Sequence, residues 1–176
     1  MKLSNEAYTP SYFIDPIREF ANGFDFDPFS CVDANKIVKA KHFYTIADNA
    51  FDSCWNYSGY RTIKVWVNPP YSTKELKSAI NKVIEFKEGK EIYLLLNTDN
   101  STEAYKLCLQ HCTALMLVHK RIQFIRPYSK SRTSHNPKTG VIQNNRAQTL
   151  FFFGSSERAV EFKHQLASLG KVFIND

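Results

Sequence analysis

The sequence predicts an α/β fold, in which helices cover both faces of a mostly parallel sheet and ligands bind at the carboxyl ends of the strands. Two observations predict it. Short apolar runs at residues 64–68, 92–96 and 114–118 are typical of buried strands. Between them, segments that start at Ser72 and Asn100 begin with helix-capping residues. This alternation of strands and helices favours parallel strands joined by crossover helices.

The amino-terminal segment predicts a capped helix. Thr9 is a favourable N-cap, and Pro10 suits the first helical position because its missing N–H needs no partner there. Pro16 is expected to kink or split this helix. A helix that starts with Thr-Pro also offers backbone N–H groups and a hydroxyl to a carboxylate.

Residues 24–30 alternate apolar and acidic side chains and then stop at Pro28. The pattern predicts a strand that delivers Asp27 and Ser30 to the ligand edge of the sheet. A carboxylate there can bind an ammonium or ribose hydroxyls and favours a nearby cation. The alternative is that Asp27 only caps a turn. The pattern between residues 31 and 60 is weaker and predicts a short helix at 35–40 and a short strand at 42–45.

The most informative stretch is the apolar run 64–68 with the turn that follows it. Pro69 and Pro70 cannot donate to a sheet, so the strand must end at Asn68. The Asn68 side-chain oxygen and the Pro69 carbonyl can both accept hydrogen bonds from an exocyclic amine, which would aim the nitrogen lone pair at an electrophile. Tyr71 offers a face for stacking, worth roughly 1–3 kcal/mol per base in single-strand binders. The alternative is a proline-terminated strand with a surface tyrosine.

The regular alternation breaks in the last third of the chain. Residues 121–126 predict a strand, 127–148 form a long polar stretch, and 149–153 return to the core. Long irregular inserts are usually functional or disordered, so we expect residues 120–148 to contact nucleic acid. The predicted helix at 157–169 and strand at 172–174 are assigned a structural role only.

Charge is unevenly distributed along the chain. Between residues 104 and 156 there are eight Lys or Arg and no Asp or Glu, which leaves 15 basic and 17 acidic residues elsewhere. One basic segment on a near-neutral domain is typical of nucleic-acid binders, although a solvated basic loop is the alternative. Arginine and asparagine are the side chains that read guanine and adenine edges, whereas lysine mostly binds phosphate. The candidate contacts are Arg121, Arg126, Lys130, Arg132, Lys138 and Arg146.

Length and composition exclude several classes. A chain of 176 residues with 43% hydrophobic residues predicts one globular domain, 1–176. No apolar run approaches about 18 residues and no signal-peptide pattern appears, so we expect a soluble, intracellular protein without a membrane partner. The four cysteines lack metal or disulfide spacing, and Cys108 and Cys112 are expected to be core thiols on one helix face. No metal site is predicted.

Residues 68–71, Asn-Pro-Pro-Tyr, resemble the Asn/Asp-Pro-Pro-Tyr motif of amino-methyltransferases that use S-adenosylmethionine. With the segments 8–10, 27–28, 48–55 and 120–124, the chain resembles the phage-type DNA N-6-adenine methyltransferase (Dam-like) family over roughly residues 8–154. The resemblance implies a Rossmann-like class I S-adenosylmethionine-dependent methyltransferase fold, a mostly parallel sheet with an antiparallel last strand. It also implies DNA as partner and the cytoplasm of a bacterial or phage-infected host cell.

The same resemblance implies roles for individual residues. The catalytic set would be Asn68, Pro69, Pro70 and Tyr71. The cofactor-binding set would be Tyr8, Thr9, Pro10, Asp27, Pro28, Ser30 and Asp48. Asp48 would contact the cofactor's adenine amine, and Trp55 would be either a core residue or a stacking face. The chain departs from the general methyltransferase pattern because Asp-Pro stands in place of the usual glycine loop.

Two alternatives remain open at the level of sequence. The same motif serves enzymes that methylate cytosine amines, RNA or protein glutamines, and the basic segment argues only against a protein substrate. A nucleic-acid-binding relative that has lost catalysis would also keep the turn. The oligomeric state, monomer or homodimer, and the recognition sequence are not predicted.

Overall fold

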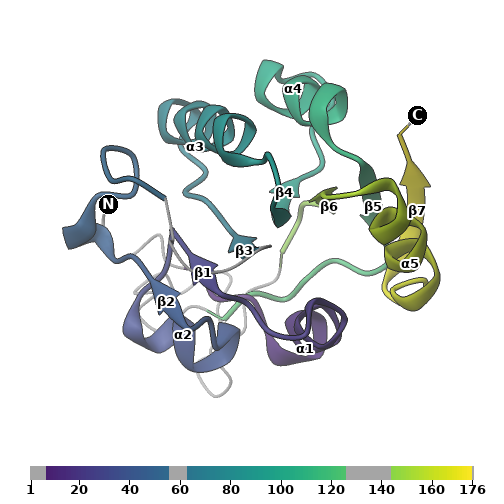
Figure 1. Ribbon diagram of the computed structural model, residues 1–176, viewed down its shortest axis with the longest axis horizontal. Coiled ribbons are helices and arrows are strands. Elements are labelled where there is room, and N and C mark those ends of the chain that lie inside the picture. Colours follow the sequence, from purple (N-terminus) through teal and green to yellow (C-terminus); the bar gives the residue numbers. More distant parts are fainter. Residues whose placement is uncertain (1–6, 56–62, 126–143, 176) are drawn as a thin grey trace.

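A computed structural model describes residues 7–55, 63–125 and 144–175, and within them seven strands form one sheet in the order β2-β1-β3-β4-β6-β5-β7 (Figure 1). The strands are β1 (Phe26–Asp27), β2 (His42–Phe43), β3 (Lys64–Val67), β4 (Glu91–Asn97), β5 (Ala114–Val118), β6 (Gln148–Phe153) and β7 (Gly170–Ile174). The helices are α1 (Ser11–Ala21), α2 (Val32–Val38), α3 (Thr73–Phe86), α4 (Glu103–His111) and α5 (Ser156–Gln165), with a 3₁₀ turn at Ile46–Asp48.

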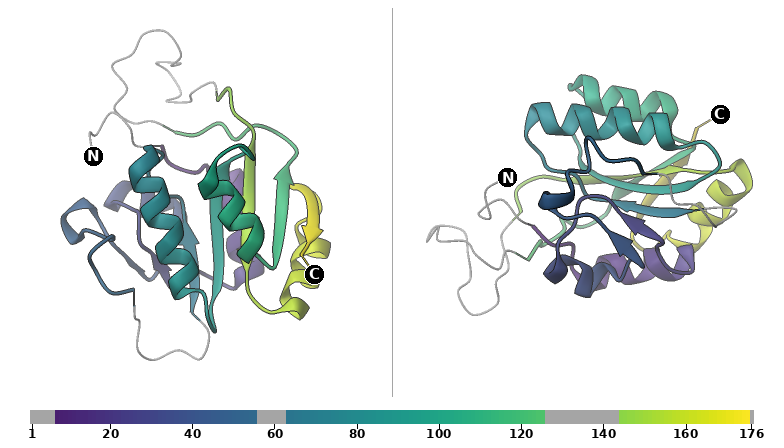
Figure 2. Two further views of the ribbon diagram at one scale, coloured as in Figure 1. Left: turned by 90° about the horizontal axis from the view of Figure 1, so that it is seen from above. Right: turned by 60° about the vertical axis from the view of Figure 1, so that its left-hand side comes forward.

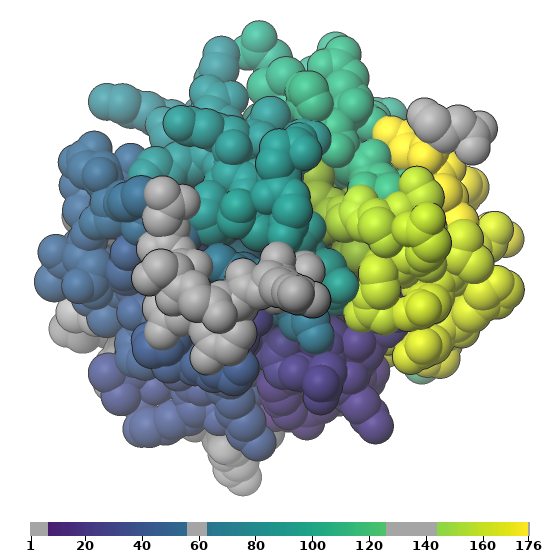
Figure 3. Space-filling model, viewed as in Figure 1, coloured from purple at the N-terminus to yellow at the C-terminus, as the bar shows by residue number. Residues whose placement is uncertain are grey.

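The helices form a layer on each side of the sheet. α3 and α4 lie side by side on one face, whereas α1, α2 and α5 cover the other (Figures 1 and 2). In the space-filling view, α3 and α4 lie above the centre of this face, α1 below it and α5 to its right (Figure 3). None of the helices in the described ranges has the length and apolar character needed to span a membrane.

Strand directions agree with the predicted α/β alternation for the first half of the chain. The pairs β1–β2, β1–β3 and β3–β4 are parallel. β6 then runs antiparallel to both β4 and β5, and β7 runs antiparallel to β5. Two strands, rather than one last strand, are therefore reversed. The chain leaves β5 and enters β6 at the same edge of the sheet, so these two antiparallel neighbours need no crossover connection.

The core is built by alternation along β3 and β4. Trp66 and Tyr93 pair in register and pack toward α1 and α5, whereas Val67 and Leu94 pack toward α3 and α4. Because both faces are covered, the strands read as continuous apolar runs rather than alternating ones. Each large side chain buried this way contributes roughly 1.5–3 kcal/mol. The same alternation directs Asn68, two residues after Trp66, to the α1 side of the sheet.

The amino-terminal helix begins later than the sequence predicts. The N-cap is Pro10, whose carbonyl accepts from the N–H groups of Phe13 and Ile14, and Thr9 makes no cap. α1 also continues past Pro16 to Ala21 without a split. Thr9 is buried, and its hydroxyl lies near the side chain of Asn68 rather than at the helix start.

Residues 121–125 are not the strand that the sequence predicts. Only Ile125 makes a β-bridge there, to Tyr8. The N–H of Ile122 donates to Gln148 Oε1 at 3.1 Å, and its carbonyl accepts from Asn144 Nδ2 at 3.0 Å. Side-chain amides therefore satisfy the backbone groups that a neighbouring strand would otherwise bind.

Candidate functional site

The carboxyl ends of β1, β3 and β4 surround a cavity of about 780 Å³. This lies within the range of about 300–1,000 Å³ that small-molecule sites occupy. Its walls come from the segment before α1, the strand ends and residues 144–146. The sequence-predicted residues that line it are Tyr8, Thr9, Asp27, Pro28, Ser30, Asn68, Pro69, Pro70, Tyr71 and Arg146.

Asn68 immediately follows β3, and its amide orientation is set by two acceptors. Nδ2 lies 3.3 Å from the Ala7 carbonyl and 3.5 Å from Thr9 Oγ1. A carbonyl can only accept, so the amide nitrogen must face this side. Oδ1 consequently faces the other way, toward Tyr71. Asn68 is thus held as a hydrogen-bond acceptor at the cavity.

Tyr71 combines a partly exposed ring with an enclosed hydroxyl. The side chain keeps 37% of its surface exposed, and the residue lines the cavity. Its hydroxyl lies 3.2 Å from Asn68 Oδ1 and 3.1 Å from the Leu95 carbonyl. Burial raises the pKa of the Tyr71 hydroxyl, so it stays a neutral donor. One hydroxyl has one proton and can serve only one acceptor at a time, so Asn68 Oδ1 keeps capacity for another donor.

The turn is rigid because helix α3 starts directly after it. Pro69 and Pro70 have restricted φ angles, and Ser72 then caps the helix by accepting from the Glu75 N–H at 3.4 Å. Tyr71 therefore lies between a proline pair and a capped helix start. This arrangement limits the positions that its ring can take.

Asp27 ends β1 and is only 2% exposed. Burial raises the pKa of its carboxyl to about 7, although hydrogen bonds from the Phe29 N–H to Oδ1 at 3.1 Å and from the Ser30 side chain oppose this effect. The Ser30 hydroxyl is buried beside this carboxyl, and Ser30 lines the cavity. A buried carboxyl next to a hydroxyl at the cavity wall is suited to a polar, positively charged ligand.

The segment before α1 forms one wall of the cavity. Tyr8 exchanges two backbone hydrogen bonds with Ile125, at 2.8 and 3.0 Å. Its hydroxyl lies 3.4 Å from the thiol of Cys31, another lining residue. Thr9 contacts Asn68 rather than a helix N-terminus, and Pro10 is not among the lining residues.

Asp48 and Trp55 lie away from the cavity wall. The Thr45 N–H and hydroxyl donate to Asp48 Oδ2 at 2.7 and 2.8 Å, which lowers the pKa of this carboxyl. Asp48 is not a lining residue, although Thr45 and Asn49 are. Trp55 is buried among the residues between the sheet and α3, and its Nε1 donates to the Ala50 carbonyl. Trp55 is therefore a core residue.

Two of the six candidate nucleic-acid contacts lie in the described part of the chain. Arg121 and Arg146 are exposed, and Arg146 lines the cavity. Arg121 does not line it. The other four lie outside the described residues: Arg126, Lys130, Arg132 and Lys138.

Sequence reasoning missed several lining residues: Glu75, Asn97, Phe124, Asn144 and Asn145. Asn97 had a detectable signal. It follows the apolar run of β4 just as Asn68 follows β3, and the carboxyl ends of parallel strands meet at one edge. The remaining four come from segments whose position depends on the tertiary structure.

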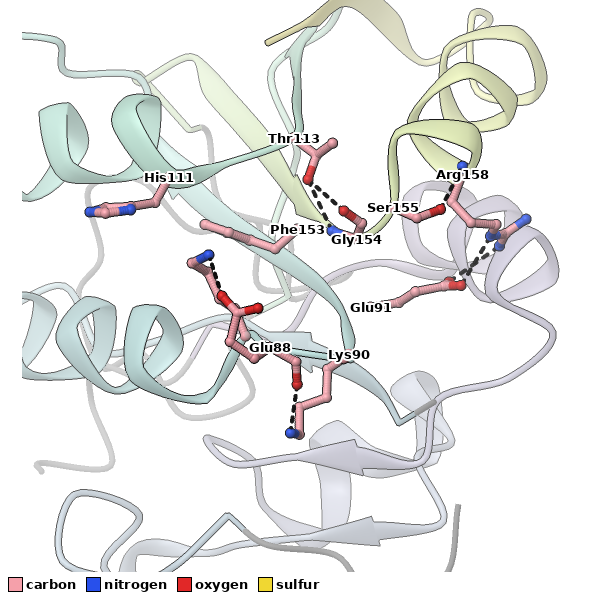
Figure 4. A pocket seen from close by; sticks show the side chains of 11 residues that line it. Glu88, Lys90, Glu91, His111, Thr113, Phe153, Gly154, Ser155 and Arg158 are labelled. Carbon is pink, nitrogen blue, oxygen red and sulfur yellow. Dashed lines mark hydrogen bonds and ion pairs between the residues drawn. The ribbon is translucent and has the colours of Figure 1, made fainter. Parts of the chain in front are cut away.

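A second cavity, of about 410 Å³, lies at the opposite edge of the sheet (Figure 4). There Arg158 and Glu91 point toward each other, with Nε 3.0 Å from Oε1 and Nη2 3.2 Å from Oε2. The Tyr93 hydroxyl donates to the same carboxylate at 2.8 Å. Because these groups satisfy one another, the cluster ties α5 to the start of β4.

Comparison with known proteins identifies a matching family and a similar phage protein. The family described as DNA N-6-adenine-methyltransferase (Dam) matches residues 5–167. A protein of Haemophilus phage HP1 (strain HP1c1), named DNA N-6-adenine-methyltransferase, is 27% identical over 149 residues, which cover 82% of this chain and 76% of the relative. The family match includes the whole cavity.

Proposed function

The chain belongs to the DNA N-6-adenine-methyltransferase (Dam) family, and we propose that it transfers a methyl group from S-adenosylmethionine to the 6-amino group of an adenine rotated out of the DNA duplex. The sheet would then be a Rossmann-like class I methyltransferase sheet. The cavity at its carboxyl edge would hold both the methyl donor and the flipped base.

The observation that carries this proposal is the orientation of Asn68. Its Oδ1 faces Tyr71 while Nδ2 is occupied by Ala7 and Thr9. An acceptor at this position suits an amine and opposes a carbonyl oxygen. Adenine and cytosine present such an amine, whereas thymine and guanine present an oxygen at the corresponding ring position.

The other half of the cavity fits the methyl donor. Asp27 supplies a buried carboxyl for the donor's ammonium or ribose, and Ser30 supplies a hydroxyl beside that carboxyl at the cavity wall. Tyr8, Thr9 and Pro28 would complete this half, and Pro10 would contact the donor from its position next to Thr9 in the chain. Asp48 would accept a hydrogen bond from the donor's adenine amine, because its neighbours Thr45 and Asn49 line the cavity.

A bound donor would supply a methyl group on a positively charged sulfur, and the electron pair of the broken C–S bond would remain on that sulfur. Asn68 Oδ1 and the Pro69 carbonyl each accept a hydrogen bond from the amine, which directs the nitrogen lone pair at the methyl carbon. The nitrogen forms the new N–C bond and then loses one proton to solvent. Pro70 keeps the corner rigid, and Tyr71 stacks on the base.

The chain needs no strong base for this reaction, because the alkylated amine is acidic enough to lose its proton to water. Rate enhancement would come from holding two reactants in line, which is worth up to about 7–11 kcal/mol for well-oriented groups. A closely fitted cavity between rigid strand ends is suited to this role.

DNA binding would rest on the basic segment. The whole chain, residues 1–176, would form one methyltransferase domain, and residues 120–148 would be its recognition insert. Arg146 supports this proposal because it is exposed and lies at the cavity. Arg121 and the four candidates outside the described residues would extend the surface along the DNA backbone.

Incubation with methyl-labelled donor and a mixture of DNA and RNA, followed by digestion to nucleosides, tests the proposal. We expect the label in N-6-methyldeoxyadenosine. Label in methylcytidine or in ribonucleosides would support the related amino-methyltransferases instead. Donor binding in calorimetry without any transfer would contradict the proposed chemistry, and the absence of both would leave only nucleic-acid binding.

The Asn68→Ala variant separates catalysis from donor binding. We expect it to lose at least about 100-fold in kcat while its donor Kd changes little, because the missing acceptor is the one that faces the amine. The matched control is Asn81→Ala on the exposed side of α3, which should keep full activity. Full activity of Asn68→Ala would refute the role of this residue.

A further inference from the structure

Asn97 and Gln148 face each other across the antiparallel β4–β6 pair at the cavity edge. Asn97 is the last residue of β4 and lines the cavity, whereas Gln148 is the first residue of β6 and is buried. Gln148 Nε2 lies 3.2 Å from Asn97 Oδ1 and 2.8 Å from the Arg146 carbonyl.

The orientation of both amides follows from one backbone group. The Ile122 N–H can only donate, so the Gln148 atom 3.1 Å from it must be the oxygen Oε1. Gln148 Nε2 is then the donor to the Arg146 carbonyl and to Asn97. The Asn97 atom that faces Gln148 must therefore be Oδ1, which leaves its Nδ2 to point away from Gln148.

The Nδ2 group of Asn97 has no hydrogen-bond partner in the part of the chain that the structure describes. Asn97 is half-buried and lines the cavity, and Nδ2 is not among the fully buried side-chain atoms that lack a partner. Two N–H donors are thus available to the cavity contents.

Asn97 also lies on the same side of the sheet as Asn68. Trp66 pairs with Tyr93, so Asn68 lies level with Leu95 and Asn97 is the next residue of β4 on that face. Neighbouring strands are about 4.8 Å apart and successive residues on one face about 6.6 Å. One planar ring can therefore contact both side chains.

We propose that Asn97 is a specificity-determining residue that donates to the ring nitrogen beside the target amine, N1 of adenine. The inference rests on the proposed function and deepens it. Asn68 supplies an acceptor and Asn97 a donor, so the pair reads an amine next to an unprotonated ring nitrogen. Guanine presents the reverse pattern, a carbonyl next to an N–H, and is rejected at both positions.

The Asn97→Asp variant tests the donor while keeping the fold contact. Aspartate retains an oxygen for Gln148 Nε2 but replaces the cavity-facing N–H groups with an acceptor. We expect kcat/KM to fall at least about tenfold, with unchanged thermal stability and donor Kd. Asn81→Asp on the exposed side of α3 controls for the added charge and should remain fully active.

A base analogue identifies the atom that Asn97 reads. Once the methylated sequence is mapped, a duplex with 1-deazaadenine at the target keeps the amine but has C–H in place of N1. Wild type should prefer adenine by about tenfold more than Asn97→Ala does, because only wild type loses a hydrogen bond with the analogue. Using the same pair of bases in both proteins cancels the analogue's effect on amine reactivity.

Equal discrimination by wild type and Asn97→Ala would overturn the proposal. In that case the enzyme would still methylate adenine, so the proposed function would stand. Failure of wild type to methylate any DNA would instead refute the proposed function itself. Loss of thermal stability in Asn97→Ala leaves the comparison valid, because discrimination is a ratio measured within one protein.

Discussion

Burial of the Asp27 carboxyl at the cavity should reduce the stability of the folded protein at neutral pH. Its carboxyl has an ordinary pKa of 3.8, and burial raises this pKa to about 7. Between these two values the folded chain holds a proton that the unfolded chain has released. The free energy of unfolding of the ligand-free protein should therefore fall as pH rises from about 4 to about 7.

The Asp27→Asn variant should remove this pH dependence. We expect the variant to gain stability relative to wild type at pH 8 and to lose that advantage at pH 4, where the wild-type carboxyl is already neutral. Urea denaturation at both pH values measures the difference. Asp33→Asn on the surface of α2 is the control. If wild type and Asp27→Asn show the same pH dependence, the Asp27 carboxyl does not titrate in this range.

The position of two candidate residues at the cavity was predictable from the sequence. Asp27 and Asn68 lie where a strand ends, because a proline follows each of them directly. The orientation of Asn97 was not predictable, because it depends on Gln148, 51 residues later in the chain. Thr9 shows the same limit: a Thr before a proline predicts a cap, yet tertiary packing brings its hydroxyl to Asn68.

At the scale of elements, helix α3 fixes the proline corner formed by residues 68–71. Ser72 caps the helix one residue after Tyr71, and its hydroxyl also donates to the Glu75 carboxylate at 2.5 Å. The cap satisfies the Glu75 N–H at the helix start and disfavours other paths for the turn. The cap thus couples helix stability to the position of the Tyr71 ring.

The Ser72→Ala variant should destabilise the protein by about 1 kcal/mol, in line with other N-cap replacements. The matched control is Ser78→Ala in the exposed middle of the same helix, where alanine has the higher helix propensity. Guanidinium denaturation of both variants gives the comparison. Equal stability changes for the two serines would show that the cap contributes nothing to the fold.

Elements were predictable where local pattern and tertiary packing agree. The runs that became β3, β4 and β5 are apolar and bounded by turn residues, and each was located within a residue or two. The run 121–125 has equally good strand composition, but the neighbouring position in the sheet is taken by β6. Its backbone is bound by side-chain amides instead. Propensity cannot reveal such competition.

At the scale of the whole molecule, chain direction brings candidate residues from three strands to one edge of the sheet. β1, β3 and β4 are parallel, so Asp27, Asn68 and Asn97 gather at their carboxyl ends. The opposite edge carries the Arg158–Glu91 pair, whose role is to close the fold. The mixed α/β class was predictable from the alternation of strands and helices, whereas the reversal of both β6 and β7 was not, because their pairing depends on contacts between segments far apart in the chain.

The uneven distribution of charge along the chain leads to a prediction about DNA affinity. Eight basic residues and no acidic ones lie between residues 104 and 156, and Arg146 from this segment is at the cavity. Replacing Arg126, Lys130 and Arg132 with glutamine should weaken DNA binding and flatten its salt dependence. For every phosphate that the protein no longer neutralises, the slope of log K against log salt should become shallower by about 0.9.

A control of equal charge distinguishes local contacts from net charge. Lys64, Lys87 and Lys90 belong to strand starts and turns at the opposite edge, and replacing all three with glutamine removes the same three charges. Counterion release depends on the phosphates that are actually contacted, so this control should weaken binding slightly and leave the slope near its wild-type value. Fluorescence anisotropy over a salt series measures both slopes. Because the slope counts phosphate contacts, equal slopes in the two triple variants would mean that DNA does not lie along the basic segment.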